Sequence, residues 1–231
     1  MSSSVIVALD FESETEALAL VSRLGQDATC YKVGLQLLIE AGPSLIRHLV
    51  SIGKQVVLDL KLHEIPHSVA AGVKAAGKLG AAMVTVHASG GSEVLRAAVA
   101  AAKPFAGLQV LALTVVTSLT DKELPEIGLA PSVQAQVERL AKLSAACGCH
   151  GVVASAHEAA FLRGFLPFGS LIVTPGIHLP GASANDQARG ATPQVAALAG
   201  ATHIVIGRGI TGSSNPAAAF AGAVGAFHHV A

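Results

Sequence analysis

Eight short runs rich in valine, isoleucine and leucine recur along this chain, and longer alanine- and leucine-rich segments lie between them. Short apolar runs bounded by turn residues predict buried strands, and the longer periodic segments predict amphipathic helices. The predicted strands are Val5–Leu9, Thr29–Val33, Val56–Leu60, Met83–His87, Val110–Val115, Gly151–Ala154, Leu171–Thr174 and His203–Ile206. The predicted helical segments include Ser13–Leu24, His67–Leu79, Ser92–Ala102, Val133–Ala146 and Thr192–Ala199.

Eight strands that alternate with helices are typical of an α/β protein with a (β/α)8 TIM barrel. No composition break or linker interrupts the pattern, so we expect residues 1–231 to form one barrel domain. A doubly wound open sheet is the alternative, because strand order cannot be read from one sequence. The segment Leu9–Glu12 after the first strand lacks the glycine-rich dinucleotide fingerprint, which weakens that alternative.

The charge balance excludes several classes of partner. The formal net charge is zero and only 13% of the residues are charged, so the sequence predicts binding neither to nucleic acid nor to a membrane surface. The longest uncharged stretch, Gly209–Ala231, is interrupted by Asn215-Pro216, which argues against a membrane span. The serine-rich start has no basic region typical of a signal peptide, and three cysteines form no disulfide framework. We therefore expect a cytoplasmic protein.

One strand ends in an unusual charged hexapeptide, Asp59–Glu64. Strand side chains alternate, so Asp59 and Lys61 should point to the same side, and Glu64 follows as a second acid. A carboxylate and an ammonium at the tip of a buried strand are costly unless they are paired or used. The alternative is a structural salt bridge, but the carboxyl ends of other strands favour chemistry.

The active sites of barrel enzymes lie at the carboxyl ends of the strands. Most predicted strands here carry a charged, hydroxyl or imidazole group at or near that end, which predicts a polar small-molecule ligand; these groups are Asp10, Lys32, Asp59, Lys61, His87, Thr114, Thr117, Ser118 and Arg208. Glycines and Arg208 after the last strand suit an oxyanion, as does the loop that starts at Pro175 and Gly176. A phosphorylated ligand is therefore expected, with the segment Pro180–Asn185 closing over it.

Over nearly its whole length the chain resembles the orotidine 5′-monophosphate decarboxylase family. The matching segments are Val7-Ala8-Leu9-Asp10, Tyr31-Lys32-Val33-Gly34, Asp59-Leu60-Lys61, Val86-His87-Ala88, Thr114-Val115-Val116-Thr117-Ser118, Thr174-Pro175-Gly176-Ile177, Asp186-Gln187-Ala188-Arg189 and Val205-Ile206-Gly207-Arg208. The Asp-x-Lys pair is shared with related phosphosugar lyases, whereas the proline-glycine loop, the Asp-Gln-x-Arg segment and the final Ile-Gly-Arg are more specific.

The resemblance implies that orotidine monophosphate (OMP) is decarboxylated to uridine monophosphate (UMP) without cofactor or metal, in the last step of pyrimidine nucleotide synthesis. It implies that Lys61 protonates C6 of the pyrimidine and that Asp59 holds Lys61 near the scissile carboxylate. It also implies a homodimer with a shared site, to which the partner contributes Glu64 and Ser68. The implied substrate-binding residues are Asp10 and Lys32 at the ribose, Thr117 at the pyrimidine, Gln187, Gly207 and Arg208 at the phosphate, and Pro175 and His178 in the loop beside it.

Three positions depart from the family pattern. This chain has Glu64 where the family pattern has an aspartate, Ser68 where it has a threonine, and His178 where it has an arginine. A longer acid beside a smaller neighbour could fill the same space, and we hypothesise that the first two changes compensate. A histidine lacks the bidentate fork of arginine, so we expect weaker phosphate binding that improves as the imidazole becomes protonated at lower pH.

Three other interpretations stay open at the level of sequence. A metal-dependent lyase acting on a phosphorylated keto sugar would share the Asp-x-Lys pair. A barrel that binds nucleotide without catalysis would result if Glu64 misplaced the lysine. A zinc site at Cys147, Cys149 and His150 is disfavoured, because a second pair of ligands is missing. His87 is expected to be a buried structural donor that lines the site.

Overall fold

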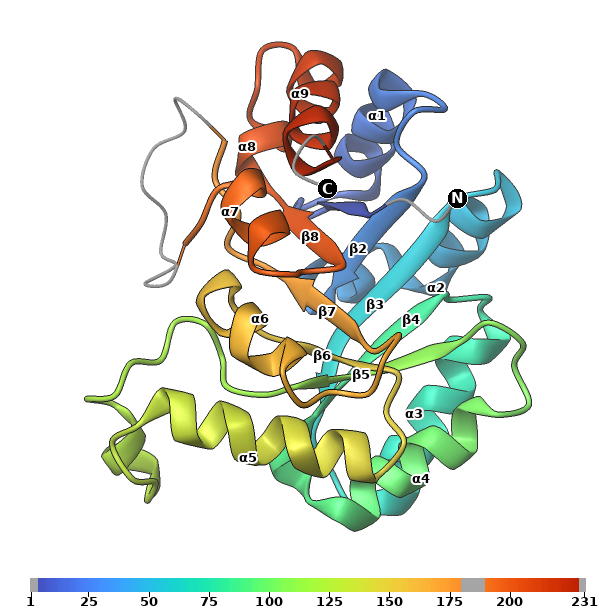
Figure 1. Cartoon of the computed structure of the whole chain (residues 1–231). Helices are drawn as coiled ribbons and strands as arrows, with labels where there is room; N and C mark the ends of the chain where they lie inside the picture. The colour runs from blue at the N-terminus through green and yellow to red at the C-terminus, as the bar shows by residue number, and fades with distance from the viewer. Residues whose placement is uncertain (1–3, 180–189, 229–231) are drawn as a thin grey trace.

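The computed structural model describes residues 4–179 and 190–228, and its centre is a closed barrel of parallel strands in the order β1 to β8 (Figure 1). Each strand pairs in parallel with the next one along the chain, and β1 pairs with β8 to close the sheet. The strands are β1 Val5–Ala8, β2 Cys30–Gly34, β3 Gln55–Leu62, β4 Met83–His87, β5 Gln109–Leu113, β6 Gly151–Val153, β7 Leu171–Thr174 and β8 His203–Ile206.

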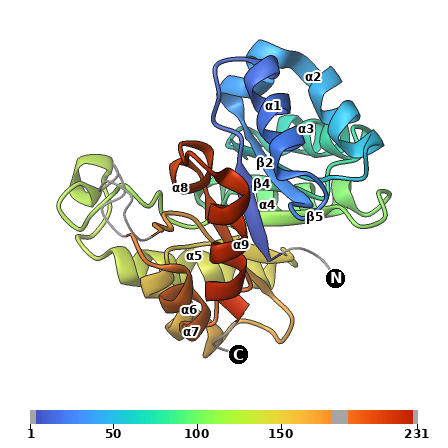
Figure 2. The same ribbon diagram turned by 90° about the horizontal axis from the view of Figure 1, so that it is seen from above.

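Helices surround the sheet, as Figure 2 shows from above, with α1 and α2 on one side of the barrel and α5, α6 and α7 on the opposite side. The main helices are α1 Glu14–Leu24, α2 Leu35–Ser51, α3 Pro66–Lys78, α4 Ser92–Ala102, α5 Val133–Ala146, α6 Ala156–Arg163, α7 Pro193–Leu198, α8 Arg208–Thr211 and α9 Pro216–His228. Two short 3₁₀ turns, η1 Ala88–Gly90 and η2 Leu124–Ile127, follow β4 and β5. Among the residues that the structure describes, no helix is both long and apolar enough to cross a bilayer.

Local sequence signals explain where several helices begin. The hydroxyl groups of Ser13, Ser132 and Thr192 accept hydrogen bonds from backbone N–H groups in the first turns of α1, α5 and α7. Such caps satisfy donors that the helix itself leaves unpaired. Helix α2 is interrupted at Gly42, whose φ of 68° lies in the left-handed region, and Pro43 follows. The break is expected there, because glycine tolerates that conformation and proline cannot donate a helical hydrogen bond.

The predicted barrel is confirmed, and the open-sheet alternative is excluded because β1 and β8 pair. The ranges predicted for β4, β7 and β8 agree with the structure, while the other strands differ by one or two residues at either end. The largest differences lie at carboxyl ends: β3 extends to Leu62 and β5 stops at Leu113. Polar residues follow these strands, so hydrophobicity alone does not show where pairing stops.

Alternating strand residues build two apolar layers. Side chains such as Val7, Tyr31 and Val84 pack outwards against the helices. The inward side chains form a separate cluster that fills the barrel: Ile6, Ala8, Cys30, Val57, Met83, Leu111, Leu113, Val153, Val173 and Val205. Above this cluster, at the carboxyl ends of the strands, the inward positions become polar, which places a site there.

Candidate active site

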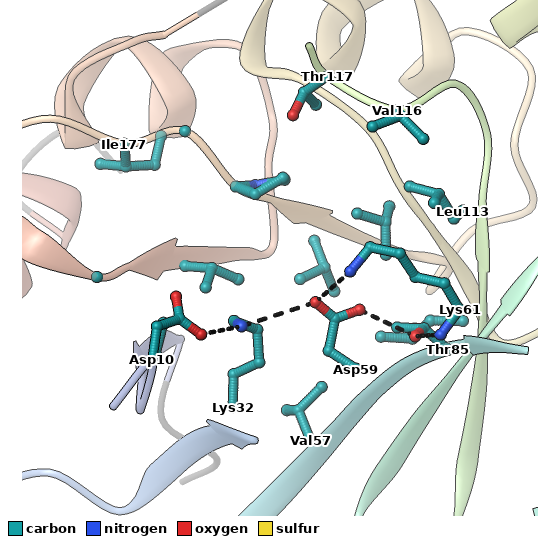
Figure 3. A pocket seen from close by; sticks show the side chains of 18 of the residues that line it. Asp10, Lys32, Val57, Asp59, Lys61, Thr85, Leu113, Val116, Thr117 and Ile177 are labelled. Atoms are coloured by element: carbon teal, nitrogen blue, oxygen red, sulfur yellow. Dashed lines mark hydrogen bonds and ion pairs between the residues drawn. The ribbon is translucent and has the colours of Figure 1, made fainter. Parts of the chain in front are cut away.

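A cavity of about 460 Å³ opens at the carboxyl ends of the strands (Figure 3). All eight strands or the loops that follow them contribute to its lining. Its wall is apolar on the side of Leu113, Val153 and Val173, and charged on the side of β1, β2 and β3. A volume of this order suits a small molecule. The predicted location of the site at this end of the barrel is therefore supported by the shape of the protein.

Carboxylate and ammonium groups alternate along the charged wall, at the carboxyl ends of β1, β2 and β3 (Figure 3). Lys32 Nζ lies 2.8 Å from Asp10 Oδ1 and 3.8 Å from Asp59 Oδ2, and Lys61 Nζ lies 2.7 Å from the same Asp59 oxygen. Only 16% of the Asp59 side chain is exposed, against 43% of the Lys61 side chain. The two lysines therefore converge on one shielded carboxylate, while the Lys61 ammonium remains accessible from the cavity.

The environment of Asp59 favours its charged form. Burial by itself raises the pKa of this carboxyl group. The positive charges of Lys61 and Lys32, with hydrogen bonds from Lys61 and Thr85, more than offset burial and hold the pKa below its usual value of 3.8. Asp59 is therefore a carboxylate at neutral pH, as a partner for an ammonium group requires.

The backbone at Lys61 is strained. Its φ of 48° is the only positive φ of a non-glycine residue in the part of the chain that the structure describes. A left-handed conformation costs a residue with a Cβ about 1–2 kcal/mol. The prediction from strand alternation that Asp59 and Lys61 point to the same side is confirmed, since both line the cavity, although the register of β3 against β4 shifts at this point. Strain of this kind concentrates at functional sites.

Thr85 is a component of the site that the sequence analysis missed. Its hydroxyl oxygen accepts a hydrogen bond from the Lys61 N–H at 2.8 Å, and the hydroxyl donates to Asp59 Oδ1 at 2.9 Å. The residue is 2% exposed and contributes to the cavity wall. A signal was available: Thr85 is a polar residue at an inward position of the predicted strand Met83–His87.

Several of the other predicted ligand-binding residues also line the cavity. Its wall includes Asp10, Lys32, Thr117, Pro175, Gly207 and Arg208, from five different strands or the loops after them. Thr117 is buried, whereas Arg208 is exposed at the start of α8. Gln187 and the segment Pro180–Asn185 lie outside the described residues.

His178 and His87 do not contribute to the cavity wall. The ring of His178 packs on Gly190, where an added Cβ would lie 2.1 Å from Nε2. The ring of His87 is half-buried and stacks on His63 with centroids 4.9 Å apart, and its Nδ1 accepts a hydrogen bond from the Ser89 amide. The expectation that His87 is a buried group lining the site is therefore wrong. Burial, followed by the charges of His63 and Lys61, lowers the pKa of His87.

Glu64 and Ser68 also lie outside the cavity of their own chain. Glu64 is exposed, and its carboxylate accepts a hydrogen bond from the neighbouring Ile65 N–H at 2.6 Å. The three-residue array of acid, lysine and acid is therefore not assembled within a single chain.

The side chains of Cys147 and His150 make contacts within the fold. No three histidine, cysteine, aspartate or glutamate side chains are grouped to hold a metal ion anywhere in residues 4–179 and 190–228. Cys147 Sγ lies 3.7 Å from the Ser92 carbonyl oxygen, and His150 Nδ1 accepts a hydrogen bond from the Val110 N–H. These contacts give both side chains a structural role between helices and strands.

Comparisons with known proteins agree with this geometry. Residues 3–223 match the Orotidine 5′-phosphate decarboxylase / HUMPS family. Orotidine 5′-phosphate decarboxylase of Sodalis glossinidius is 47% identical over 95% of this chain and 88% of its own length. The enzyme of the same name from Anaeromyxobacter dehalogenans is 44% identical over 94% and 95%.

A solved structure extends the similarity to three dimensions. The crystal structure of orotidine 5′-phosphate decarboxylase from Lactobacillus acidophilus superposes with a TM-score of 0.86 at 37% identity, over 97% of this chain and 98% of the other. Sequence and structure thus point to the same relatives across almost the full length. The chain belongs to the orotidine 5′-phosphate decarboxylase / HUMPS family.

Proposed function

We propose that this protein decarboxylates orotidine 5′-monophosphate to uridine monophosphate in the last step of de novo pyrimidine synthesis. The observation that carries the proposal is the ion pair of Lys61 and Asp59, with 2.7 Å between Nζ and Oδ2, in the cavity of a protein whose relatives are decarboxylases. The three free cysteines fit the reducing conditions of a cytoplasm.

The reaction breaks the bond between C6 and the carboxylate, and the electron pair stays on C6 as carbon dioxide leaves. The Lys61 ammonium donates a proton to C6 to form UMP, and the lysine regains a proton from water. A preorganised cation at the developing carbanion lowers the barrier, because little reorganisation is needed during the reaction. Asp59 holds the ammonium in place and lies where the substrate carboxylate would approach it.

The remaining lining residues suit the rest of a nucleotide. In this proposal Asp10 and Lys32, 2.8 Å apart, bind the ribose hydroxyl groups, and Thr117 binds the pyrimidine edge. Gly207 and Arg208 bind the phosphate beside the Pro175 loop. Gln187 and His178 remain predicted phosphate contacts.

A second copy of the chain would complete the site. Glu64 and Ser68 lie outside their own cavity, and the adjacent Ile65 is 62% exposed. Ile39 on α2 is 77% exposed. Large exposed apolar side chains, one of them next to Glu64 in the chain, fit a homodimer in which each chain donates Glu64 and Ser68 to the other.

Mixing two inactive variants tests the shared site. Lys61→Ala and Glu64→Ala subunits, unfolded and refolded together, form some dimers with one intact site. Random pairing should restore about a quarter of the wild-type activity if the sites are shared. If each chain supplied its own Glu64, the mixture would stay inactive.

The activity itself is tested by following the ultraviolet absorbance of orotidine monophosphate in the presence of a chelator, with Lys61→Ala as control. We expect rapid loss of the orotate chromophore with the wild type alone. Nucleotide binding without turnover would favour the non-catalytic barrel. Absence of binding would favour the metal-dependent lyase that acts on a phosphorylated keto sugar.

A further inference from the structure

We propose that Thr85 is a positioning residue, whose hydroxyl group holds the Asp59 carboxylate and the Lys61 backbone in their reactive arrangement. The inference deepens the proposed function and rests on it for its kinetic consequence. Its geometric basis is the pair of hydrogen bonds that Thr85 makes to both residues of the catalytic pair.

The pairing of β3 with β4 is irregular beside Thr85. Leu58 pairs with Val84 and Leu62 pairs with Val86, so three residues of β3, 59–61, lie opposite Thr85 alone. Regular pairing would give each backbone N–H a carbonyl partner in the ladder. At this irregularity the Lys61 N–H instead donates to the Thr85 hydroxyl oxygen at 2.8 Å. A side chain of β4 therefore replaces a backbone bond at the point of strain.

The direction of the Thr85 hydroxyl proton follows from its two hydrogen bonds. A hydroxyl group has one proton, and a backbone N–H can only donate. Since the Thr85 oxygen accepts from the Lys61 N–H, its own proton is free to point at Asp59 Oδ1, 2.9 Å away. The other carboxylate oxygen, Oδ2, is then left for the Lys61 ammonium at 2.7 Å. Thr85 thus sets how the Asp59 carboxylate is turned.

Thr85 is itself held rigidly within the sheet. It is 2% exposed, lies in the middle of β4, and pairs with Leu111 of β5 on its other side. A β-branched side chain has few accessible χ1 rotamers, so the position of the hydroxyl follows from the backbone. Precise support of this kind matters because a displacement of about 1 Å at a catalytic group can cost about 100-fold in rate.

Two matched pairs of variants separate the hydroxyl group from the size of the side chain. Thr85→Val keeps the shape and removes the oxygen. Thr85→Ala and Thr85→Ser are both smaller than threonine and differ by the oxygen alone. Val84→Ala serves as a control for destabilised β4, because Val84 is buried against the helices and lies outside the cavity.

We expect Thr85→Val and Thr85→Ala to lower kcat by about 100-fold, with KM changed by less than about threefold. Thr85→Ser and Val84→Ala should stay within about threefold of the wild type. Equal losses of kcat in Thr85→Ser and Thr85→Ala would overturn the proposal. A wild-type kcat in Thr85→Val would overturn it as well. If Thr85→Val does not fold, the Ala and Ser pair decides.

A structural measurement separates failure of this inference from failure of the proposed function. If the wild type does not decarboxylate orotidine monophosphate, the proposed function fails, and crystal structures of the wild type and of Thr85→Ala still test the positioning role. If Thr85 positions the pair, Asp59 Oδ2 should move away from Lys61 Nζ in the variant. An unchanged arrangement of Asp59 and Lys61 would contradict it.

Discussion

The two halves of strand β3 differ sharply. From Gln55 to Leu58 the strand pairs in register with β2, and the side chain of Val57 is buried in the apolar interior of the barrel. From Asp59 to Leu62 its register with β4 shifts, a positive φ occurs at Lys61, and charged side chains replace apolar ones at the inward positions. One half follows the rules of a stable sheet and the other departs from them.

The difference shows that stability and chemistry depend on different parts of the barrel. The apolar interior below the cavity supplies stability, because burying apolar side chains is the main favourable term in folding. The carboxyl ends of the strands hold strained backbone and converging charges, which persist only because the surrounding structure determines their positions. Stability and chemistry can therefore be perturbed separately in this molecule.

The largest effect is expected for the ammonium group at the irregular end of β3. Lys61→Ala should reduce kcat by about 10³-fold or more, because it removes the proposed proton donor, which is also the cation proposed to face the carbanion. The absorbance assay measures the rate. A cooperative urea unfolding transition of the variant should show that Lys61→Ala is folded. Activity within about tenfold of the wild type would assign proton transfer to another group.

A substitution in the apolar interior of the barrel should lower the stability of the protein and leave kcat unchanged. Ile6 is fully buried inside the barrel and does not line the cavity. Ile6→Ala should lower the free energy of unfolding by about 2–5 kcal/mol, since it removes buried methyl groups and leaves a void. The kcat of the folded variant should equal that of the wild type. A large loss of kcat at unchanged stability would show that the two regions are coupled.

The ion pair at Asp59 predicts a specific pH dependence of stability. Because folding lowers the pKa of Asp59, its stabilising contribution is complete above the ordinary value of 3.8 and is lost as the pH falls through the folded-state pKa. Asp59→Asn lacks this contribution. The difference in unfolding free energy between wild type and variant should therefore narrow as the pH falls from about 6 to about 3, measured by urea titration. A constant difference would show that another group carries the effect.

The smallest effect isolates the strain at Lys61. Both Lys61→Gly and Lys61→Ala remove the ammonium, but only glycine adopts the positive φ without a steric cost. The glycine variant should be more stable to urea than the alanine variant by about 1 kcal/mol. Equal stabilities would indicate that the backbone relaxes once the lysine is gone.

Much of this protein could be predicted from the sequence because the relevant signals are local. Strand runs such as Met83–His87 and His203–Ile206 are short, apolar and bounded by turns, so their positions follow from neighbouring residues. The convergence of Lys32, Asp59 and Lys61 could be predicted because parallel strands of a barrel present their carboxyl ends at one face.

The role of Thr85 could not be predicted in the same way. Its bond to the Lys61 N–H joins residues 24 positions apart in the chain, and it exists only because β3 bulges against β4. The positive φ of Lys61 occurs at the same irregularity and does not follow from strand alternation. The expected lining role of His87 failed because its ring stacks on His63 outside the cavity.

The sequence by itself therefore determined the (β/α)8 architecture, the end of the barrel that carries the site, and the pairing of an aspartate with a lysine there. Only the tertiary structure decided the left-handed backbone of Lys61 and the hydroxyl group that holds it. The physical reason is range: hydrophobic periodicity acts over a few neighbouring residues, whereas the register of β3 against β4 is set by packing of the whole closed sheet.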